Sequence, residues 1–540
     1  MSTSPRPRAA VVLAAPLLVL ACQRESVPED STSGATTGGS TAEPDATGAV
    51  TSASTTSSSS GATTGEPAED RATLVHSFGV YPLQPHQEIE PCVQWTLGNE
   101  QAIYVNAVTL VNDGGYHHSN WFVVPEDVYP GDDGRWNCWD RGFSELEAAV
   151  KGTVLFAQST QSRHEVMPLP AGVVVKVPPR HKVISQTHLL NLGSTELDTE
   201  LRLGLDIIHP RDVEVVVAPM HLDYRDLHIL ADQRTRFTGD CSFGDAYAKA
   251  AQKPLDLKLY YVLPHYHYLG EYFRLEVLGG PRDGEVLFQL DGFNGGANGK
   301  AFDPPVDLSG ADGLRFACGY DNWLNKEIGY GIGDQEMCAM LGLADARVMI
   351  ESNVSQGSKV VGVDGDVTLY EADCDSFAVF KNPAQSLPTQ EEKDAPLYVP
   401  PREPGDVDLD PVKPCVDSDP AAAPLDTVTL TALRDAVLAP SCVFSSCHDA
   451  AAPAAGLDLQ TASGLRARLL GHDVVADTKM PLVAPGDPDG SWLFELVARC
   501  DPSDDKGLTV THMPFNAPTL LPDAQVATLR AWIAAGALDD

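Results

Sequence analysis

Positive charge is scarce in this chain of 540 residues. Lysine and arginine number 37 against 75 aspartates and glutamates, which gives a formal net charge of -38 and a pI near 4.6. This balance argues against electrostatic binding to nucleic acid or to anionic membrane surfaces. It agrees with a solvated protein outside the cytoplasm and carries no information about chemistry.

The N-terminal apolar run is too short to cross a bilayer as a helix. It spans Ala9–Ala21 behind two arginines, which predicts a signal peptide over residues 1–21. The segment Val19–Cys22 resembles the bacterial lipobox, whose cysteine is lipidated and becomes the new N-terminus. Gln23 after it favours the outer membrane, by resemblance to Gram-negative lipoproteins. We therefore expect a lipid-anchored protein on the outer membrane or facing the periplasm; the alternative is an ordinary signal peptide with an incidental Cys22.

Aromatic residues are absent from residues 23–70, where Ser, Thr, Gly and Ala dominate. Such a segment cannot bury enough apolar surface to become ordered, so residues 22–72 are predicted to be a disordered tether.

The chain has 11 cysteines, and their number supports an oxidising compartment. Without Cys22 and the pair Cys442 and Cys447, eight remain, enough for four disulfides with none left over. The sequence alone leaves their pairing open. The eight are Cys92, Cys138, Cys241, Cys318, Cys338, Cys374, Cys415 and Cys500.

Short β-branched runs separated by turn residues dominate the middle of the chain, for example Val173–Val177 and Lys182–Ser185. This pattern indicates antiparallel sandwiches rather than βαβ units. We predict a mainly β fold with two consecutive antiparallel, jelly-roll-like sandwich domains, over residues 73–230 and 231–382.

The last part of the chain changes character. Residues 383–425 are proline-rich and acidic, which predicts a linker. Residues 426–540 are predicted to form a small all-α domain. Asp523 can cap a helix that Gly536 ends. Its apolar face carries Val526, Leu529, Trp532 and Ile533.

Two sets of side chains are candidate metal ligands. His265 and His267 are two residues apart, which on a strand places both on one face. Met337 adds a thioether, a soft ligand that favours Cu(I) over zinc, calcium or magnesium. Taken singly, a His-x-His pair is often structural or binds zinc, and Met337 could be a core residue.

The second set contains imidazoles alone. His117 and His118 are adjacent, so on a regular strand they point apart and we expect them to converge in a turn, which Gly114 and Gly115 supply. His188 follows an apolar strand-like run and completes the set. An adjacent histidine pair is also a common surface feature.

The order of these segments, His-His, His, His-x-His and Met-Cys over roughly residues 75–380, resembles the copper type II ascorbate-dependent monooxygenases, the family of peptidylglycine α-hydroxylating and dopamine β-monooxygenases. The resemblance implies an electron-transfer copper and a second copper at which dioxygen is activated. The ligands implied for the first are His117, His118 and His188, and for the second His265, His267 and Met337. It also implies a disulfide between Cys318 and Cys338 beside the methionine.

The implied activity is hydroxylation of a C–H bond in a small organic substrate with O2, using ascorbate or another electron donor. Peptidylglycine members bind the peptide carboxylate through an arginine and an asparagine, where this chain has Leu263 and Ala339. Neither can hold an anion, which favours a less polar substrate. The alternative is a non-catalytic copper-binding surface lipoprotein with the same fold. Five further histidines match no ligand position and are interpreted as structural: His164, His181, His209, His221 and His228.

A haem attachment motif is predicted in the last domain. The spacing C-x4-C-H places Cys442, Cys447 and His448 where two thiols can bind haem c covalently and an imidazole can be its proximal ligand. With Met513-Pro514 downstream, the domain resembles small cytochrome c domains of bacterial surface proteins. That likeness implies Met513 as the distal ligand, with Met480 and His512 as rivals. We expect the haem to pass electrons to the coppers; the alternatives are a Cys442–Cys447 disulfide or a docking domain without haem.

Overall fold

The computed structural model describes residues 70–540 apart from several short gaps. The signal peptide, Cys22 and the tether up to residue 69 lie outside the described residues, and of His117 only the backbone is described. The gaps are residues 86, 159–162, 192–195, 268, 293–298, 323, 325, 332–334, 346–347, 381–385, 402–406, 408, 410–414, 444–446, 451–452, 473, 475–477, 479, 504–509, 511, 516 and 518.

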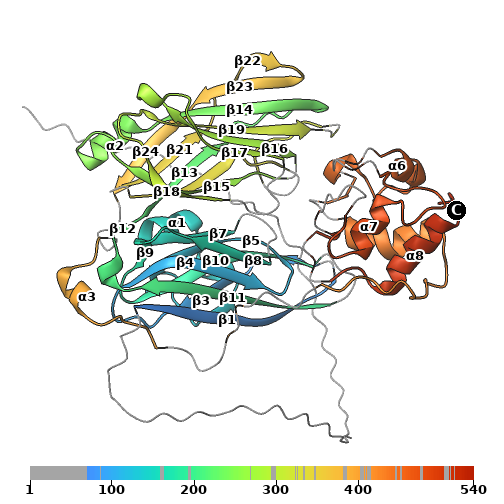
Figure 1. Ribbon diagram of the computed structural model, residues 1–540, viewed down its shortest axis with the longest axis horizontal. Coiled ribbons are helices and arrows are strands. Elements are labelled where there is room, and N and C mark those ends of the chain that lie inside the picture. Colours follow the sequence, from blue (N-terminus) through green and yellow to red (C-terminus); the bar gives the residue numbers. More distant parts are fainter. Residues whose placement is uncertain are drawn as a thin grey trace, which may run out of the picture. The chain divides into compact units, whose positions relative to one another are not determined.

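The fold is mainly β, as predicted. The first sandwich has two six-stranded sheets, one in the order β1-β11-β4-β9-β12 with β8 beside β4, the other in the order β6-β3-β10-β5-β7 with β2 beside β10 (Figure 1). The strands are β1 Arg71–Leu83, β2 Glu88–Ile89, β3 Cys92–Thr96, β4 Ile103–Asn112, β5 Tyr116–Pro125, β6 Gly134–Trp136, β7 Thr153–Gln158, β8 His164–Pro168, β9 Val173–Val177, β10 His181–Leu190, β11 Leu197–Ile208 and β12 Val215–Val216. The short helices are η1 Cys138–Arg141, α1 Glu145–Lys151 and η2 Pro210–Asp212.

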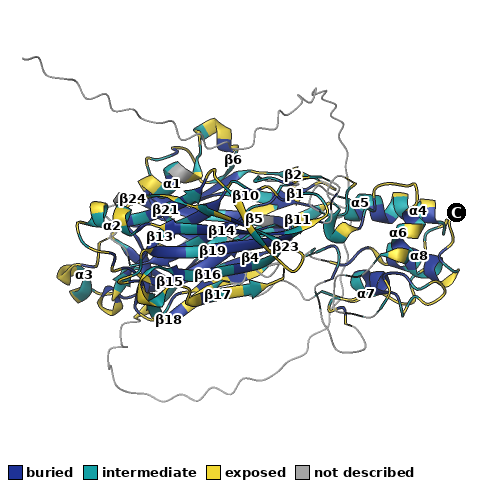
Figure 2. Cartoon of the chain, turned by 90° about the horizontal axis from the view of Figure 1, so that it is seen from above, coloured by how far each residue is buried: buried dark blue, intermediate teal, exposed yellow. Residues whose placement is uncertain are grey.

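The continuous valine run of β9 is explained by burial on both faces. Val173 and Val175 pack in the main core of the sandwich, whereas Val174 packs with Ile208 and Val216 on the other face. Strands buried on both sides need apolar residues at consecutive positions rather than alternation. Figure 2 shows the resulting buried interior of the sheets.

The second sandwich has sheets in the orders β18-β15-β20-β13-β21-β24 and β17-β16-β19-β14-β23-β22. Its strands are β13 Ala218–Tyr224, β14 Gln233–Ser242, β15 Lys258–His265, β16 Gly270–Leu278, β17 Val286–Asp291, β18 Lys300–Asp307, β19 Gly313–Asn322, β20 Ala339–Ala344, β21 Val348–Val354, β22 Lys359–Asp364, β23 Val367–Asp373 and β24 Asp375–Phe380. Its helices are α2 Gly244–Ala251 and η3 Gly280–Arg282.

Two details differ from the prediction. The second sandwich starts with β13 at Ala218, before the expected boundary at residues 230 and 231, because Met220 and Leu222 belong to its core. The sheets are also not purely antiparallel. The pairs β9–β12, β13–β21 and β14–β23 run parallel, which requires crossovers that strand patterns alone do not reveal.

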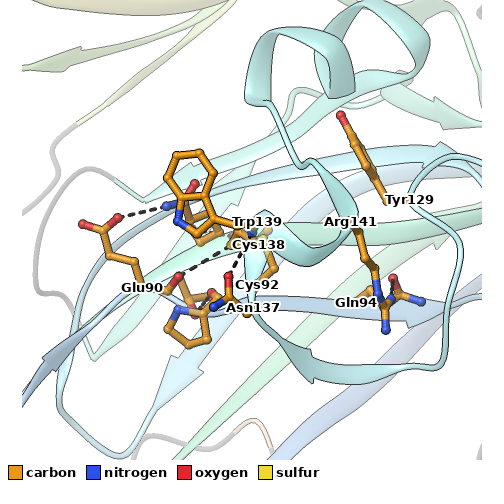
Figure 3. The surroundings of a disulfide bond; sticks show 12 residues. Glu90, Cys92, Gln94, Tyr129, Asn137, Cys138, Trp139 and Arg141 are labelled. Carbon is orange, nitrogen blue, oxygen red and sulfur yellow. Dashed lines mark hydrogen bonds between the residues drawn. A yellow bond between two sulfur atoms is a disulfide. The ribbon is translucent and has the colours of Figure 1, made fainter. Parts of the chain in front are cut away.

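The eight cysteines form four disulfides, as their number predicted. The bonds are Cys92–Cys138, Cys241–Cys374, Cys318–Cys338 and Cys415–Cys500. The first ties η1 to β3 and holds the exposed Trp139 beside it (Figure 3). Cystines of this number are typical of proteins in oxidising compartments.

The proline-rich segment is not a free linker throughout. It contains α3 Gln390–Asp394, which a Thr389–Glu392 capping box begins. The Tyr104 hydroxyl donates a hydrogen bond to Glu392 at 2.9 Å, and Tyr398 packs against the core of the first sandwich. This part of the predicted linker is therefore attached to the first sandwich.

The final region is helical, with a core of its own. The predicted helix is confirmed as α8 Asp523–Ala534; Val526, Leu529, Trp532 and Ile533 are buried. The cap position is Pro522, so Asp523 is the first helical residue. The other helices are α4 Leu430–Leu433, η5 Arg434–Leu438, α5 Ala439–Cys442, η6 Ala454–Gly456, α6 Leu465–Gly471 and α7 Trp492–Ala498. Over the described part of the chain, no helix has the length and apolarity to span a membrane.

Candidate functional site

His118 and His188 lie side by side in one sheet of the first sandwich. They are directly opposite on β5 and β10, and their ring centroids are 4.9 Å apart. His188 pairs with His118 and Leu189 pairs with Tyr116, so His117 is the extra residue of a β-bulge. We expected His117 and His118 to lie in a turn, and this prediction is wrong, because both belong to strand β5. A bulge breaks the alternation of side chains within a strand and can re-aim one of two neighbours.

A carboxylate orients the His188 ring. Its Nε2 lies 2.8 Å from Oε1 of Glu88, on the adjacent strand β2. When Nε2–H donates to this carboxylate, Nδ1 is the unprotonated nitrogen of the ring. Hydrogen bonds of this kind fix the tautomer of metal-binding histidines.

His265 and His267 lie where β15 ends. His265 is the last residue of the strand, and His267 lies in the turn that follows, where the Gly270 N–H donates to its carbonyl at 3.0 Å. The expectation that both lie on one strand face is therefore wrong. Pro264 helps to end the strand, because it has no N–H and β18 no longer pairs at this position. The two rings still converge, with centroids 5.2 Å apart.

The two histidine pairs meet across the boundary between the sandwiches. The ring centroids of His118 and His265 are 6.4 Å apart. Leu263, two residues before His265 on the same face of β15, packs in the core of the first sandwich. This face of the sheet therefore brings His265 toward β5, and the rings of His188, His118, His265 and His267 form a continuous series of neighbours.

The segment before Met337 is held against the His267 turn. Glu336 is fully buried; its carboxylate accepts the backbone N–H groups of Leu269 and His267 at 2.7 and 2.8 Å. Burial raises the pKa of Glu336 to about 8, although bonds from the Leu269, His267 and Met337 N–H groups oppose this shift. The Tyr320 hydroxyl donates to the Met337 carbonyl at 2.7 Å.

The Cys318–Cys338 disulfide adds a covalent link next to Met337, as the family resemblance implied. On the His267 side, Nδ1–H donates to the Gln335 carbonyl at 2.7 Å, which makes Nε2 the unprotonated ring nitrogen. Burial lowers the pKa of His267, opposed by this bond, so the ring is neutral at physiological pH. A neutral imidazole is the form that binds metals.

These donors fit copper in kind. Imidazoles in both pairs and the thioether of Met337 in the segment beside the second pair are ligand types that Cu(I) prefers. Among the described side chains, no group of three or more His, Cys, Asp and Glu is arranged to hold a metal ion. Each predicted set of three ligands contributes only two histidine side chains to such a group. In the first set the side chain of His117 lies outside the described atoms, and in the second the third ligand is a methionine.

The sheet next to His265 carries residues that the sequence did not single out. Asp223 lies beside Ala339, which is itself the neighbour of His265. Asp223 is fully buried and accepts hydrogen bonds from Arg225 and, at 3.3 Å, from the Tyr330 hydroxyl. His221, two residues earlier, binds both carboxylate oxygens of Glu351 at 3.1 Å. No local motif marks these residues, since they meet only through strand pairing.

Leu263 and Ala339, which stand at the carboxylate-binding positions of the resemblance, both lie close to His265. Ala339 is its direct partner on β20, and Leu263 pairs with Leu341 on the same strand. On the sheet face that carries His265, Leu263 on β15 and Ala339 on β20 are therefore apolar, and Asp223 on β13 and Glu351 on β21 bring charged groups to the neighbouring strands.

The predicted haem motif begins at the end of α5. Cys442 is the final residue of α5, and the N–H of His448 donates to the Cys442 carbonyl at 3.0 Å. Pro440 lacks an N–H, so the Ala436 carbonyl instead accepts a bond from the Gln525 amide at 3.0 Å. This contact fixes the helix that carries Cys442 to α8.

The chemistry of this motif fits a covalently bound haem. The cysteines Cys442 and Cys447 form no disulfide, so the alternative bridge is not present. Burial, with a smaller contribution from Cys447, raises the pKa of Cys442 to about 12. The Nδ1–H of His448 donates to the Leu457 carbonyl at 3.0 Å, which presents Nε2 as an axial donor.

Met513 packs against the same core cluster as Cys442. Its backbone N–H donates to the Leu496 carbonyl in α7 at 2.7 Å. The rival His512 is buried, and its Nδ1 has no hydrogen-bond partner among the described residues. Burial lowers the pKa of His512, so it too is a neutral donor.

Comparisons with known proteins match this chain by structure but not by sequence. No protein-family model and no characterised protein sequence matches it. Among solved structures it is similar to the major capsid protein P2 of bacteriophage PM2, with 7% identity and a TM-score of 0.21 over 51% of this chain and 97% of that chain. It is also similar to the top component of cowpea mosaic virus, with 10% identity and a TM-score of 0.22 over 55% and 93%. TM-scores this low support no inference about function.

Proposed function

We propose that the chain is a copper-dependent monooxygenase that hydroxylates a C–H bond of an organic substrate with O2. The observation that carries this proposal is the series of neighbouring imidazoles, His188, His118, His265 and His267, beside the braced segment of Met337. Bound copper would supply one-electron chemistry and dioxygen activation.

The residues divide into an all-imidazole set and a mixed set. His118 and His188, with His117, would hold the electron-transfer copper, and the sheet pairing of the first two preorganises them. His265, His267 and Met337 would hold the second copper, and the thioether would favour its cuprous state. The His118–His265 contact makes the path between the two sets short, which suits transfer of the second electron.

The substrate is an organic molecule with an apolar group near the reacting carbon. Ala339 would lie against that group, because it is the direct partner of His265 on β20, whereas Leu263 packs in the core of the first sandwich. They offer no charge to a carboxylate, so a peptide with a terminal glycine carboxylate is disfavoured.

The last region would deliver electrons as a c-type cytochrome. Its unbridged thiols Cys442 and Cys447 and the oriented His448 ring support this role. A hydroxylation consumes two electrons from outside, and a haem transfers one at a time. Ascorbate or another reductant would be the ultimate donor, and a lipid anchor at Cys22 would keep the enzyme at a membrane surface.

Metal analysis of periplasmically expressed protein tests the proposal. We expect two coppers per chain, together with O2 consumption that requires reductant. Met337→Ala should keep the first copper and abolish the consumption, whereas Met349→Ala, a matched methionine on β21, should change neither. Copper binding without any reductant-dependent O2 uptake across a substrate screen would instead support the non-catalytic lipoprotein, and absence of copper would refute both.

A further inference from the structure

Glu336 joins two segments that are far apart in the sequence. Its Oε2 accepts the backbone N–H of His267 at 2.8 Å, and its Oε1 accepts the backbone N–H of Leu269 at 2.7 Å. The N–H of Met337 also donates to this carboxylate. One buried side chain therefore binds both the His-x-His turn and the methionine segment.

Other contacts hold the same two segments. The Tyr320 hydroxyl and the Cys318–Cys338 disulfide attach the methionine segment to β19. The His267 ring donates to the Gln335 carbonyl. Glu336 differs because its carboxylate binds the backbones of both segments at once. Two of the N–H groups that it accepts belong to the predicted ligands His267 and Met337.

The geometry of this position uses both oxygens of one carboxyl group. Two backbone N–H groups point at two different oxygens, and each oxygen accepts one of them. A glutamine has one acceptor oxygen and one NH2 donor, so one of the two N–H groups would face another donor.

We propose that Glu336 is a positioning residue that sets the distance from the Met337 thioether to the imidazoles of His265 and His267. This inference rests on the proposed copper site. Without the carboxylate, the turn and the methionine segment lose their shared anchor, and the sulfur no longer reaches a metal held by the two rings.

The test compares full-length Glu336→Gln with Glu336→Asp, which keeps both oxygens on a shorter stem. In Glu336→Gln we expect the sulfur scatterer near reduced copper to disappear or move away in X-ray absorption, while imidazole scattering remains. Cuprous affinity at this site should fall about 10- to 100-fold, the usual effect of losing a residue that supports a ligand. Glu336→Asp should recover part of both.

A metal-free readout accompanies the copper measurements. Hydrogen exchange of the peptides containing His267, Leu269 and Met337 should accelerate in Glu336→Gln, because the single oxygen of the glutamine amide cannot accept all the N–H groups that the carboxylate accepts. The control is Glu327→Gln, which removes an exposed carboxylate paired with His228 and should change neither exchange nor copper scattering.

The outcomes separate this role from the copper site itself. Unchanged sulfur scattering and affinity in folded Glu336→Gln overturn the positioning role alone. A wild-type protein without copper or without a sulfur scatterer overturns the proposed site and this role together. If Glu336→Gln does not fold, Glu336→Asp provides the test. A wild-type spectrum and wild-type amide exchange in Glu336→Asp would show that the position of the carboxylate does not matter, and would overturn the positioning role.

Discussion

His188 lies directly opposite His118 in the sheet, with their ring centroids 4.9 Å apart, and a Glu88 carboxylate oxygen lies 2.8 Å from its Nε2. Strand pairing thus places two imidazoles side by side, and a third strand supplies the group that orients one of them. A metal bound by this pair would meet side chains that the sheet already preorganises, so its binding free energy would not be spent on ordering a loop.

Removal of the orienting carboxylate is expected to weaken the first copper site. Glu88→Ala should lower copper affinity at His118 and His188 about 10- to 100-fold, because the tautomer and angle of the His188 ring are no longer fixed. Competition with a coloured copper chelator measures this, and Glu90→Ala, which removes a carboxylate bonded to Gln186, is the control. Tighter binding in Glu88→Ala would contradict it and show that copper uses the nitrogen that Glu88 holds.

The pairing of His221 with Glu351 should make stability depend on pH. Burial opposes protonation of this ring, but the Glu351 carboxylate outweighs it and raises the pKa of His221 to about 9. An unfolded histidine titrates near pH 6.5, so the stabilisation is fully present below about pH 6.5 and is lost as pH rises through about 9.

Thermal unfolding of wild type and His221→Gln at about pH 6 and about pH 10 measures this effect. The unfolding midpoint of the wild type should fall more between the two pH values than that of the variant. Glu351→Gln should flatten the profile in the same way, and the double variant should add nothing further. Parallel profiles for wild type and His221→Gln would refute the coupling.

The sequence predicted regular elements well where one local period sufficed. The helix that carries Trp532 and the strand Val173–Val177 follow directly from their apolar patterns. The positions of His117 and His267 did not, because a bulge depends on register with β10 and a strand end depends on where β18 stops pairing. Both partners lie far away along the chain.

The candidate site divides in the same way. Ligand types and spacing were visible in the sequence, and so was the even number of cysteines. The supporting residues Glu336 and Asp223 were not, because a buried carboxylate looks like any surface glutamate or aspartate until its backbone donors and strand neighbours are known. The short His118–His265 contact likewise depends on packing between two sandwiches.

Loss of the disulfide beside Met337 should lower both the stability of the protein and its affinity for the second copper. Cys318→Ser with Cys338→Ser opens a loop closed over a sequence separation of 20 residues and is expected to cost about 3 kcal/mol by chain entropy. Urea unfolding followed by tryptophan fluorescence measures this cost, and the second copper should bind more weakly.

Cys415→Ser with Cys500→Ser is the matched control, because that disulfide lies in the last part of the chain. It should destabilise the helical region and leave copper binding unchanged. Equal effects of both double variants on the second copper would contradict a local role for Cys318 and Cys338.

Axial ligation in the last region can be decided between three side chains. Met513 packs with Cys442 against one core and is held at its backbone by Leu496, so its thioether is the expected distal ligand.

Haem staining of denatured protein should be positive and should be lost in Cys442→Ser with Cys447→Ser. Met513→Ala should then remove the long-wavelength band of a methionine-bound ferric haem and lower the reduction potential, because a thioether ligand raises it. Met480→Ala should leave both unchanged; the same spectral loss in His512→Ala, with Met513→Ala silent, would assign the haem to the buried imidazole instead.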